Sequence, residues 1–111
     1  MNKNEYYLFV CNSGEIRSPD AARIAKEDLA RLGKPLVDTD FAGLNNRQIM
    51  REKLPMATRV FVMEDYMRGL IQKRHHYRGK IACLNIPEEL SYDRAALEDK
   101  LRDVLPEMLF R

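Results

Sequence analysis

Residues 6–19 read Tyr-Tyr-Leu-Phe-Val-Cys-Asn-Ser-Gly-Glu-Ile-Arg-Ser-Pro, and this stretch decides the fold. Its first five residues are a continuous apolar run, which is typical of a strand buried on both faces of a parallel sheet. Ser18, Pro19 and Asp20 then offer a helix N-cap, a proline at the first helical position and an acid in the first turn. Apolar residues recur on one helical face until Gly33, which supplies a stop. The stretch therefore predicts a buried strand, a short loop and a helix.

Similar strand and helix patterns alternate along the rest of the chain. Strands are expected at residues 5–11, 36–42, 59–64 and 80–86, and helices at residues 18–32, 46–54, 65–75 and 94–109. Asp93 is a candidate N-cap for the last helix, whereas Pro106 removes a backbone donor and is expected to kink or end that helix near residue 105. Strands that alternate with helices predict an α/β domain with a parallel sheet and right-handed crossovers.

Length, charge and cysteine content limit the possible functions. We expect the 111 residues to form a single domain, residues 1–111. The 19 basic and 17 acidic residues are interspersed and leave a net charge of +2, so neither nucleic acid nor a membrane surface is indicated as a partner. No signal sequence or membrane-spanning run is evident, which indicates the cytoplasm and reduced cysteines. The two cysteines lack zinc-ligand spacing, which argues against a zinc site. We expect no cofactor.

Cys11 and Arg17 bracket the loop between the first predicted strand and helix. Unpaired N–H groups and the dipole of a helix N-terminus favour an anion, and α/β sheets bind ligands at the carboxyl ends of their strands. Arginine adds a planar fork for two phosphate oxygens, and such surroundings stabilise a cysteine thiolate. The loop is therefore a candidate phosphate site with a cysteine nucleophile. The alternative is a buried strand-end cysteine beside a surface arginine.

Residues 9–19 resemble the phosphate-binding loop of the low-molecular-weight protein tyrosine phosphatases, because Phe9-Val10-Cys11 is followed by Ile16-Arg17-Ser18-Pro19. Residues 41–43, 60–65 and 80–89 resemble later blocks of the family, the last of them the fourth strand and acid loop of a shortened bacterial branch. The resemblance covers nearly the whole chain. It implies a three-layer α/β domain with a four-stranded parallel sheet flanked by helices. It also implies hydrolysis of phosphotyrosine or similar aryl phosphomonoesters, without a metal, through a phosphocysteine.

The resemblance implies roles for the loop residues. Cys11 would be the nucleophile, Arg17 would bind phosphate, and Ser18 would donate a hydrogen bond to the sulfur, a role that competes with its use as N-cap. The backbone of the whole loop would bind the equatorial oxygens, and its residues are Asn12, Ser13, Gly14, Glu15, Ile16 and Arg17. Gly14 suits a left-handed backbone position where the family has asparagine. Glu15 would favour basic substrates if it points outward and would weaken phosphate binding if it points inward.

The family uses an aspartate after its fourth strand as general acid, and here Pro87 is followed by Glu88 and Glu89. Either glutamate is a candidate acid, and the alternative is that both are solvated loop charges. Asp93 is the better candidate for a helix cap than for the acid. The substrate would then be a phosphorylated protein or a small aryl phosphate.

Two other functions and several other residues compete with this interpretation. The chain could be a phosphate- or phosphopeptide-binding module with little turnover, or a phosphotransfer domain, although Arg17 favours hydrolysis over onward transfer. Cys83 is best explained as core packing. Tyr66 and Tyr92 are candidates either for the pocket mouth or for being phosphorylated themselves. A solvated face or a contact with a phosphorylated partner would explain a basic cluster of Lys73, Arg74, His75, His76 and Arg78.

Overall fold

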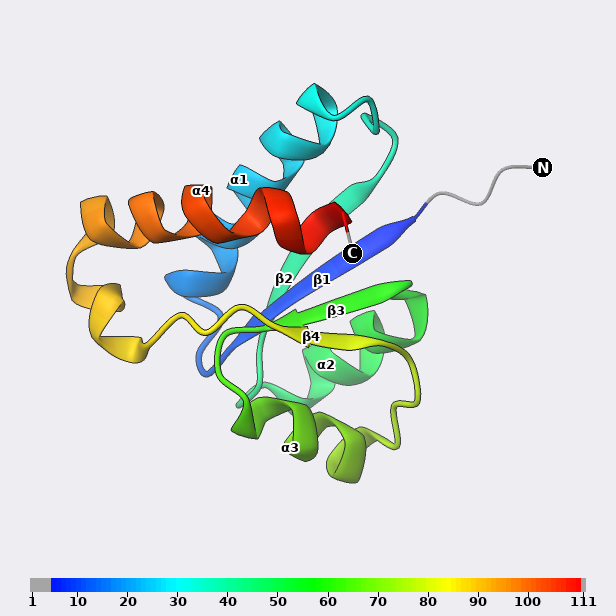
Figure 1. Cartoon of the computed structure of the whole chain (residues 1–111). Helices are drawn as coiled ribbons and strands as arrows, with labels where there is room; N and C mark the ends of the chain where they lie inside the picture. Colours follow the sequence, from blue (N-terminus) through cyan, green and yellow to red (C-terminus); the bar gives the residue numbers. More distant parts are fainter. Residues whose placement is uncertain (1–4, 111) are drawn as a thin grey trace.

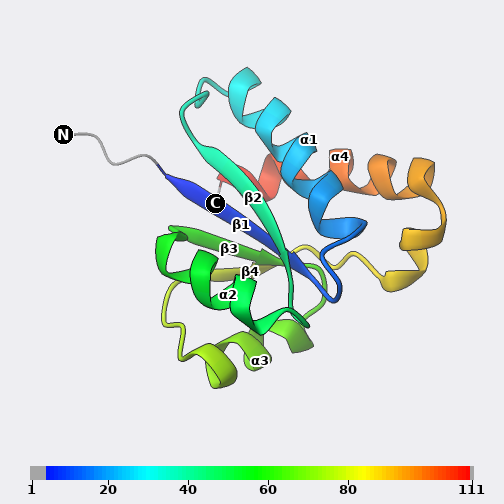
Figure 2. The same cartoon turned by 180° about the vertical axis from the view of Figure 1, so that it is seen from behind.

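The computed structural model describes residues 5–110, which form a parallel sheet between two layers of helices. The strands are β1 (Tyr6–Cys11), β2 (Asp38–Gly43), β3 (Arg59–Val62) and β4 (Ile81–Cys83), in the order β2-β1-β3-β4. The helices are α1 (Arg17–Arg31), α2 (Arg47–Lys53), α3 (Tyr66–His75) and α4 (Arg94–Phe110), with short 3-10 turns at Leu54–Met56 and Glu88–Tyr92. Helices α1 and α4 cover one face of the sheet, and α2 and α3 cover the other (Figure 1, Figure 2). All four predicted strands and all four predicted helices are present, with boundaries shifted by a few residues.

The central position of β1 in the sheet explains why residues 7–10 are all apolar and do not alternate with polar residues. Strand β1 lies between β2 and β3 and has a helix on each face, so both sides of the strand are buried. Leu8, Phe9 and Val10 are fully buried, and the Phe9 ring stacks on Phe61 of β3 with 4.8 Å between the ring centroids. The carboxyl end of the best-buried strand is thus a rigid base for the loop that follows Cys11.

The last helix does not end near residue 105, so the expectation that Pro106 would end it there is wrong. Helix α4 runs through Pro106 to Phe110. Leu105 and Leu109 on either side of the proline are buried in the core, and this burial compensates for the missing backbone donor. Arg59 of β3 also donates hydrogen bonds of 3.1 Å to the carbonyl oxygens of Met108 and Leu109, which stabilises the last turn.

Other helix boundaries follow the predicted signals. Asp93 caps α4, because its Oδ1 accepts a hydrogen bond from the Ala96 N–H at 3.1 Å. Gly33 ends α1 with a φ of +81°, a left-handed conformation in which a Cβ would be strained. Across residues 5–110, no helix combines the length and hydropathy that crossing a bilayer requires.

Candidate active site

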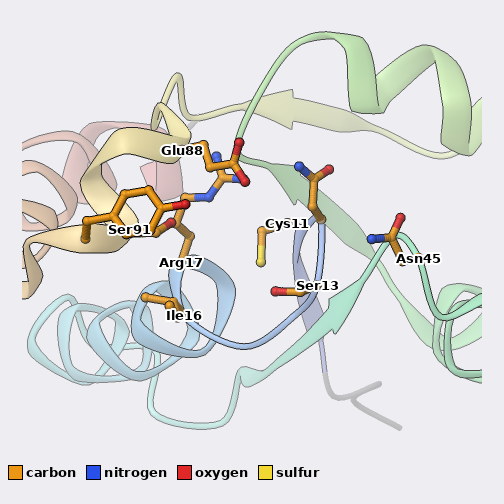
Figure 3. Close-up of a pocket in the computed structure, with 9 residues that line it drawn as sticks. Cys11, Ser13, Ile16, Arg17, Asn45, Glu88 and Ser91 are labelled. Carbon is orange, nitrogen blue, oxygen red and sulfur yellow. The ribbon is translucent and has the colours of Figure 1, made fainter.

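A cavity of about 480 Å³ opens at the carboxyl end of the sheet, around the loop that joins β1 to α1. The loop after β2 and the 3-10 turn after β4 complete its walls. Figure 3 shows the Cys11 sulfur between Glu88 and Arg17 on one side and Asn45 on the other. The lining residues are Cys11, Asn12, Ser13, Ile16, Arg17, Asn45, Glu88, Ser91 and Tyr92.

The Cys11 sulfur is surrounded by hydrogen-bond donors. The Gly14 N–H donates to Sγ at 3.2 Å, and the fully buried Ser18 hydroxyl lies 3.1 Å from Sγ. The same hydroxyl is 3.5 Å from the Ala42 carbonyl oxygen, to which it can donate when the cysteine is a neutral thiol. When the sulfur is a thiolate, it can only accept, so Ser18 must turn its proton to Sγ. These two donors stabilise negative charge on the sulfur.

Ser18 is therefore not the N-cap of α1, and that prediction is wrong. The helix begins one residue earlier, at Arg17, and Ile16 occupies the N-cap position without a side-chain hydrogen bond. The hydroxyl of Ser18 contacts the Cys11 sulfur and does not accept a hydrogen bond from the first turn of α1. An uncapped helix start leaves main-chain N–H groups without a side-chain acceptor, which favours an anion in front of them.

Arg17 is anchored through one nitrogen of its guanidinium. Its Nη1 donates to Glu64 Oε1 at 2.6 Å and to the Ile86 carbonyl oxygen at 2.8 Å, and the residue is only 3% exposed. Its Nε and Nη2 donate to no other residue among those that the structure describes. Because Arg17 also lines the cavity, these two nitrogens can serve as a fork for an anion. Arg17 is thus not a free surface charge.

Two glycines let the loop pack directly on the end of β2. Gly14 has a φ of +74°, which confirms its predicted left-handed conformation. A Cβ on Gly14 would lie 2.5 Å from the Gly43 nitrogen, and a Cβ on Gly43 would lie 2.3 Å from the Ser13 carbonyl oxygen. Main-chain hydrogen bonds reinforce this contact, from Leu44 N–H to the Cys11 carbonyl at 2.7 Å and from Asn45 N–H to the Asn12 carbonyl at 3.0 Å.

Four predicted site residues do not line the cavity: Gly14 and Ser18, which contact the Cys11 sulfur, and Glu15 and Glu89. The side chain of Glu15 is exposed and does not line the cavity, so it points outward from the loop. Glu88 lines the cavity, whereas the neighbouring Glu89 does not. Tyr92 lies at the cavity wall, and the Tyr66 hydroxyl donates to Asn12 Oδ1 at 2.6 Å, beside the mouth.

Sequence reasoning assigned no role to Glu64, Asn45 or Ser91. Glu64 directly follows the apolar run 60–63, so it lies at the same edge of the sheet as Cys11. A polar residue at that position is a signal that could have revealed the partner of Arg17. Asn45 and Ser91 have no comparable signal, because both lie in irregular segments whose course depends on tertiary packing.

Several solved structures are similar to this chain. YfkJ from Bacillus subtilis has a TM-score of 0.80 at 15% identity, over 98% of this chain and 94% of its own. A protein tyrosine phosphatase from Entamoeba histolytica has a TM-score of 0.76 at 16% identity, over 96% of each chain. The YwlE arginine phosphatase, from Bacillus subtilis, has a TM-score of 0.67 at 19% identity, also over 96% of each chain.

The fold is that of the low-molecular-weight protein tyrosine phosphatases. The three-layer domain and the four-stranded parallel sheet that the resemblance implied are therefore confirmed. At the level of sequence, no family model and no curated protein matches this chain.

Proposed function

We propose that this chain is a cysteine-dependent phosphomonoesterase that acts on phosphotyrosine or a similar aryl phosphate, in a phosphorylated protein or a small molecule. One observation carries the proposal: a cysteine sulfur with two hydrogen-bond donors and an anchored arginine line the same cavity. The name of the Entamoeba histolytica protein supports the substrate class. Ile16 and Tyr92 add apolar surface that suits an aryl group. Residues 1–111 would act as one domain, and two unpaired cysteines favour the reducing cytoplasm.

The reaction proceeds in two steps. The Cys11 thiolate attacks phosphorus, a P–S bond forms, and the bond from phosphorus to the ester oxygen breaks. The Arg17 fork and the N–H groups of residues 12–17, apart from the Gly14 N–H that donates to the sulfur, bind the three non-bridging oxygens, which spread the charge of the transition state. Glu88 gives its proton to the leaving oxygen. Water then attacks the phosphorus of the phosphocysteine, and Glu88 takes a proton from this water. The P–S bond breaks, so that phosphate is released and the thiolate is restored.

Glu88 is the proposed acid because it lines the cavity and Glu89 does not. This difference provides a matched pair of variants with the same chemistry at adjacent positions. Glu88→Gln should lower kcat for p-nitrophenyl phosphate and for phosphotyrosine, with the larger loss for the poorer leaving group. Glu89→Gln should leave kcat close to that of the wild-type enzyme. Equal effects of the two substitutions would exclude Glu88 as the acid.

The decisive experiment compares turnover by the wild-type protein with that of Cys11→Ser. Wild-type turnover that disappears in Cys11→Ser, together with phosphate trapped on sulfur after acid quenching, is the expected result. Wild-type turnover no higher than that of Cys11→Ser would refute hydrolysis. If phosphate still bound to such an inactive protein, the phosphate-binding module would be the better description.

A phosphoguanidinium group is a second candidate substrate. YwlE is an arginine phosphatase with the same fold, and the carboxylate of Glu88 in the cavity could pair with a guanidinium. The exposed Glu15 adds a negative charge beside the loop. Values of kcat/KM for phosphoarginine and phosphotyrosine, measured side by side, distinguish the two substrate classes.

A further inference from the structure

A second cavity, of about 440 Å³, lies at the opposite end of the molecule from Cys11. Its walls are the last turns of α2 and α3 and the segment that leads into β4. Helix α3 begins with Tyr66, which contacts Asn12, and its ten residues carry the chain about 15 Å away from the active-site loop. Figure 1 shows this last turn at the amino ends of the strands, where the chain turns back into β4. The cavity is therefore separate from the candidate active site.

Among residues 5–110, the side chains of the arginines around this second cavity have no hydrogen-bond or ion-pair partner, unlike the other arginines of that range. Arg51, Arg74 and Arg78 line the cavity. Arg47 lies close enough for its charge to affect His75, which is also part of the lining. None of these four forms a hydrogen bond or ion pair with another residue in the described range 5–110, and no carboxylate lines the cavity. Each remaining arginine in this range reaches a carboxylate or a main-chain carbonyl, namely Arg17, Arg23, Arg31, Arg59, Arg68, Arg94 and Arg102.

The local excess of positive charge acts on His75 as well. Its pKa is held below the ordinary value by burial and by the nearby charges of Arg51, Arg47 and Arg74. Its Nε2 atom is buried without a hydrogen-bond partner. The negative end of a helix dipole amounts to about half an elementary charge, so the ends of α2 and α3 offset about one of the three charges on the lining arginines. The remaining charge would attract an anion that enters the cavity.

The shape and chemistry of the walls indicate more than a bare anion. Leu54, Pro55 and Tyr77 contribute apolar surface to the same lining. His76 turns the chain at the end of α3 with a φ of +52°, and Tyr77 packs against Gly79. The volume falls within the roughly 300–1,000 Å³ that is usual for small-molecule sites, and arginine suits bidentate recognition of phosphate.

We propose that this second cavity binds a small organic phosphate of the nucleotide class. Its phosphate groups would contact Arg51, Arg74 and Arg78, and its ring would lie against Leu54, Pro55 and Tyr77. The site is independent of the proposed hydrolysis at Cys11, because it shares no lining residue with the first cavity.

Calorimetric titration of the full chain with ATP tests the proposal, with adenosine and inorganic pyrophosphate as comparison ligands. ATP should bind more tightly than either, because each comparison ligand lacks one half of the recognised structure. The double variant Arg51→Gln/Arg74→Gln should weaken ATP binding by about tenfold or more. Lys73→Gln is the matched control, since Lys73 precedes Arg74 on the same helix but does not line the cavity, and it should change affinity less than twofold.

Amide chemical shifts identify where the ATP binds. Shifts at residues 51–55 and 74–79, which persist in Arg17→Met, are the expected result. The proposal is overturned if shifts occur only at residues 12–17, if the double variant binds ATP as well as the wild-type protein, or if pyrophosphate binds as tightly as ATP. Binding of a phosphopeptide at these residues in place of ATP would also overturn it. Circular dichroism of each variant, including the buried Arg17→Met, checks that the fold is intact.

Discussion

Gly43→Ala should damage the active-site loop through a steric contact alone. A Cβ at this position would lie 2.3 Å from the Ser13 carbonyl oxygen, 2.4 Å from the Ser13 carbonyl carbon and 2.8 Å from the Gly14 nitrogen. Real Cβ atoms stay at least 3.0 Å from such neighbours, so the loop must move by about 0.7 Å. All three neighbours are backbone atoms, and none of them can rotate away. The Gly14 N–H that donates to the Cys11 sulfur moves with them.

The size of the effect follows from this displacement. Overpacking against backbone costs about 1–3 kcal/mol of unfolding free energy, which corresponds to a decrease in Tm of about 4–12 °C for a domain of this size. A displacement approaching 1 Å in a catalytic loop costs up to about 100-fold in rate, so kcat should fall by about 10- to 100-fold. The decrease in kcat should therefore exceed what partial unfolding at the assay temperature explains.

Thermal unfolding and phosphatase assays of Gly43→Ala and Gly69→Ala provide the measurement. A Cβ on Gly69, within α3, meets nothing within 4 Å, so this control should gain about 0.5–1 kcal/mol from its better helix propensity. The two glycine-to-alanine substitutions thus have opposite expected signs. If Gly43→Ala unfolded at the wild-type temperature and retained wild-type kcat, the close packing of loop and strand would be refuted.

Three further predictions concern charged groups. Glu64→Gln weakens the anchor of Arg17 and should lower kcat about tenfold while reducing stability by only about 1–2 kcal/mol, because Glu64 is partly exposed; unchanged kcat would contradict the anchoring role. Arg59→Met removes the hydrogen bonds to the end of α4 and the stacking on Phe61, and should cost about 2–3 kcal/mol in urea unfolding, far more than Arg102→Met at an exposed ion pair. Burial raises the pKa of Asp40, but hydrogen bonds from Tyr6, the Phe41 N–H and Lys53 outweigh burial and lower this pKa overall. Since the pKa in the folded state lies below that in the unfolded state, ionised Asp40 adds stability above about pH 4 and loses it as the pH falls further. The stability difference between wild type and Asp40→Asn should therefore shrink in acid, and a difference that stayed constant down to pH 2 would contradict this origin.

Sequence alone predicted the elements whose signals are local. The continuous apolar run of β1, the left-handed Gly14 and Gly33, and the cap at Asp93 all appear as expected. In each case the residues that determine the conformation are neighbours in the chain. The position of Cys11 and Arg17 at the carboxyl end of a strand follows from the same local signals.

The sequence-based predictions that were wrong or missing concern residues whose role depends on contacts far away in the sequence. Ser18 could cap a helix or contact a sulfur, and only the approach of Ala42 and Cys11 from other elements decides between them. Pro106 disfavours a helix locally, but burial of Leu105 and Leu109 against distant residues maintains it. Glu64 is far from Arg17 in sequence, and the ion pair exists only because β1 and β3 are adjacent. Tertiary contacts of this kind have no local signal.

The position of β2 at the edge of the sheet affects how the protein loses function. Edge strands open at lower free energy than central ones, and the carboxyl end of β2 holds the active-site loop through Gly43 and two main-chain hydrogen bonds. Mild denaturant should therefore detach this strand and abolish turnover while β1 and β3 remain folded. Activity then reports on the edge of the sheet, whereas circular dichroism reports on its centre. The denaturant concentration that halves activity should therefore be lower than the one that halves the circular dichroism signal.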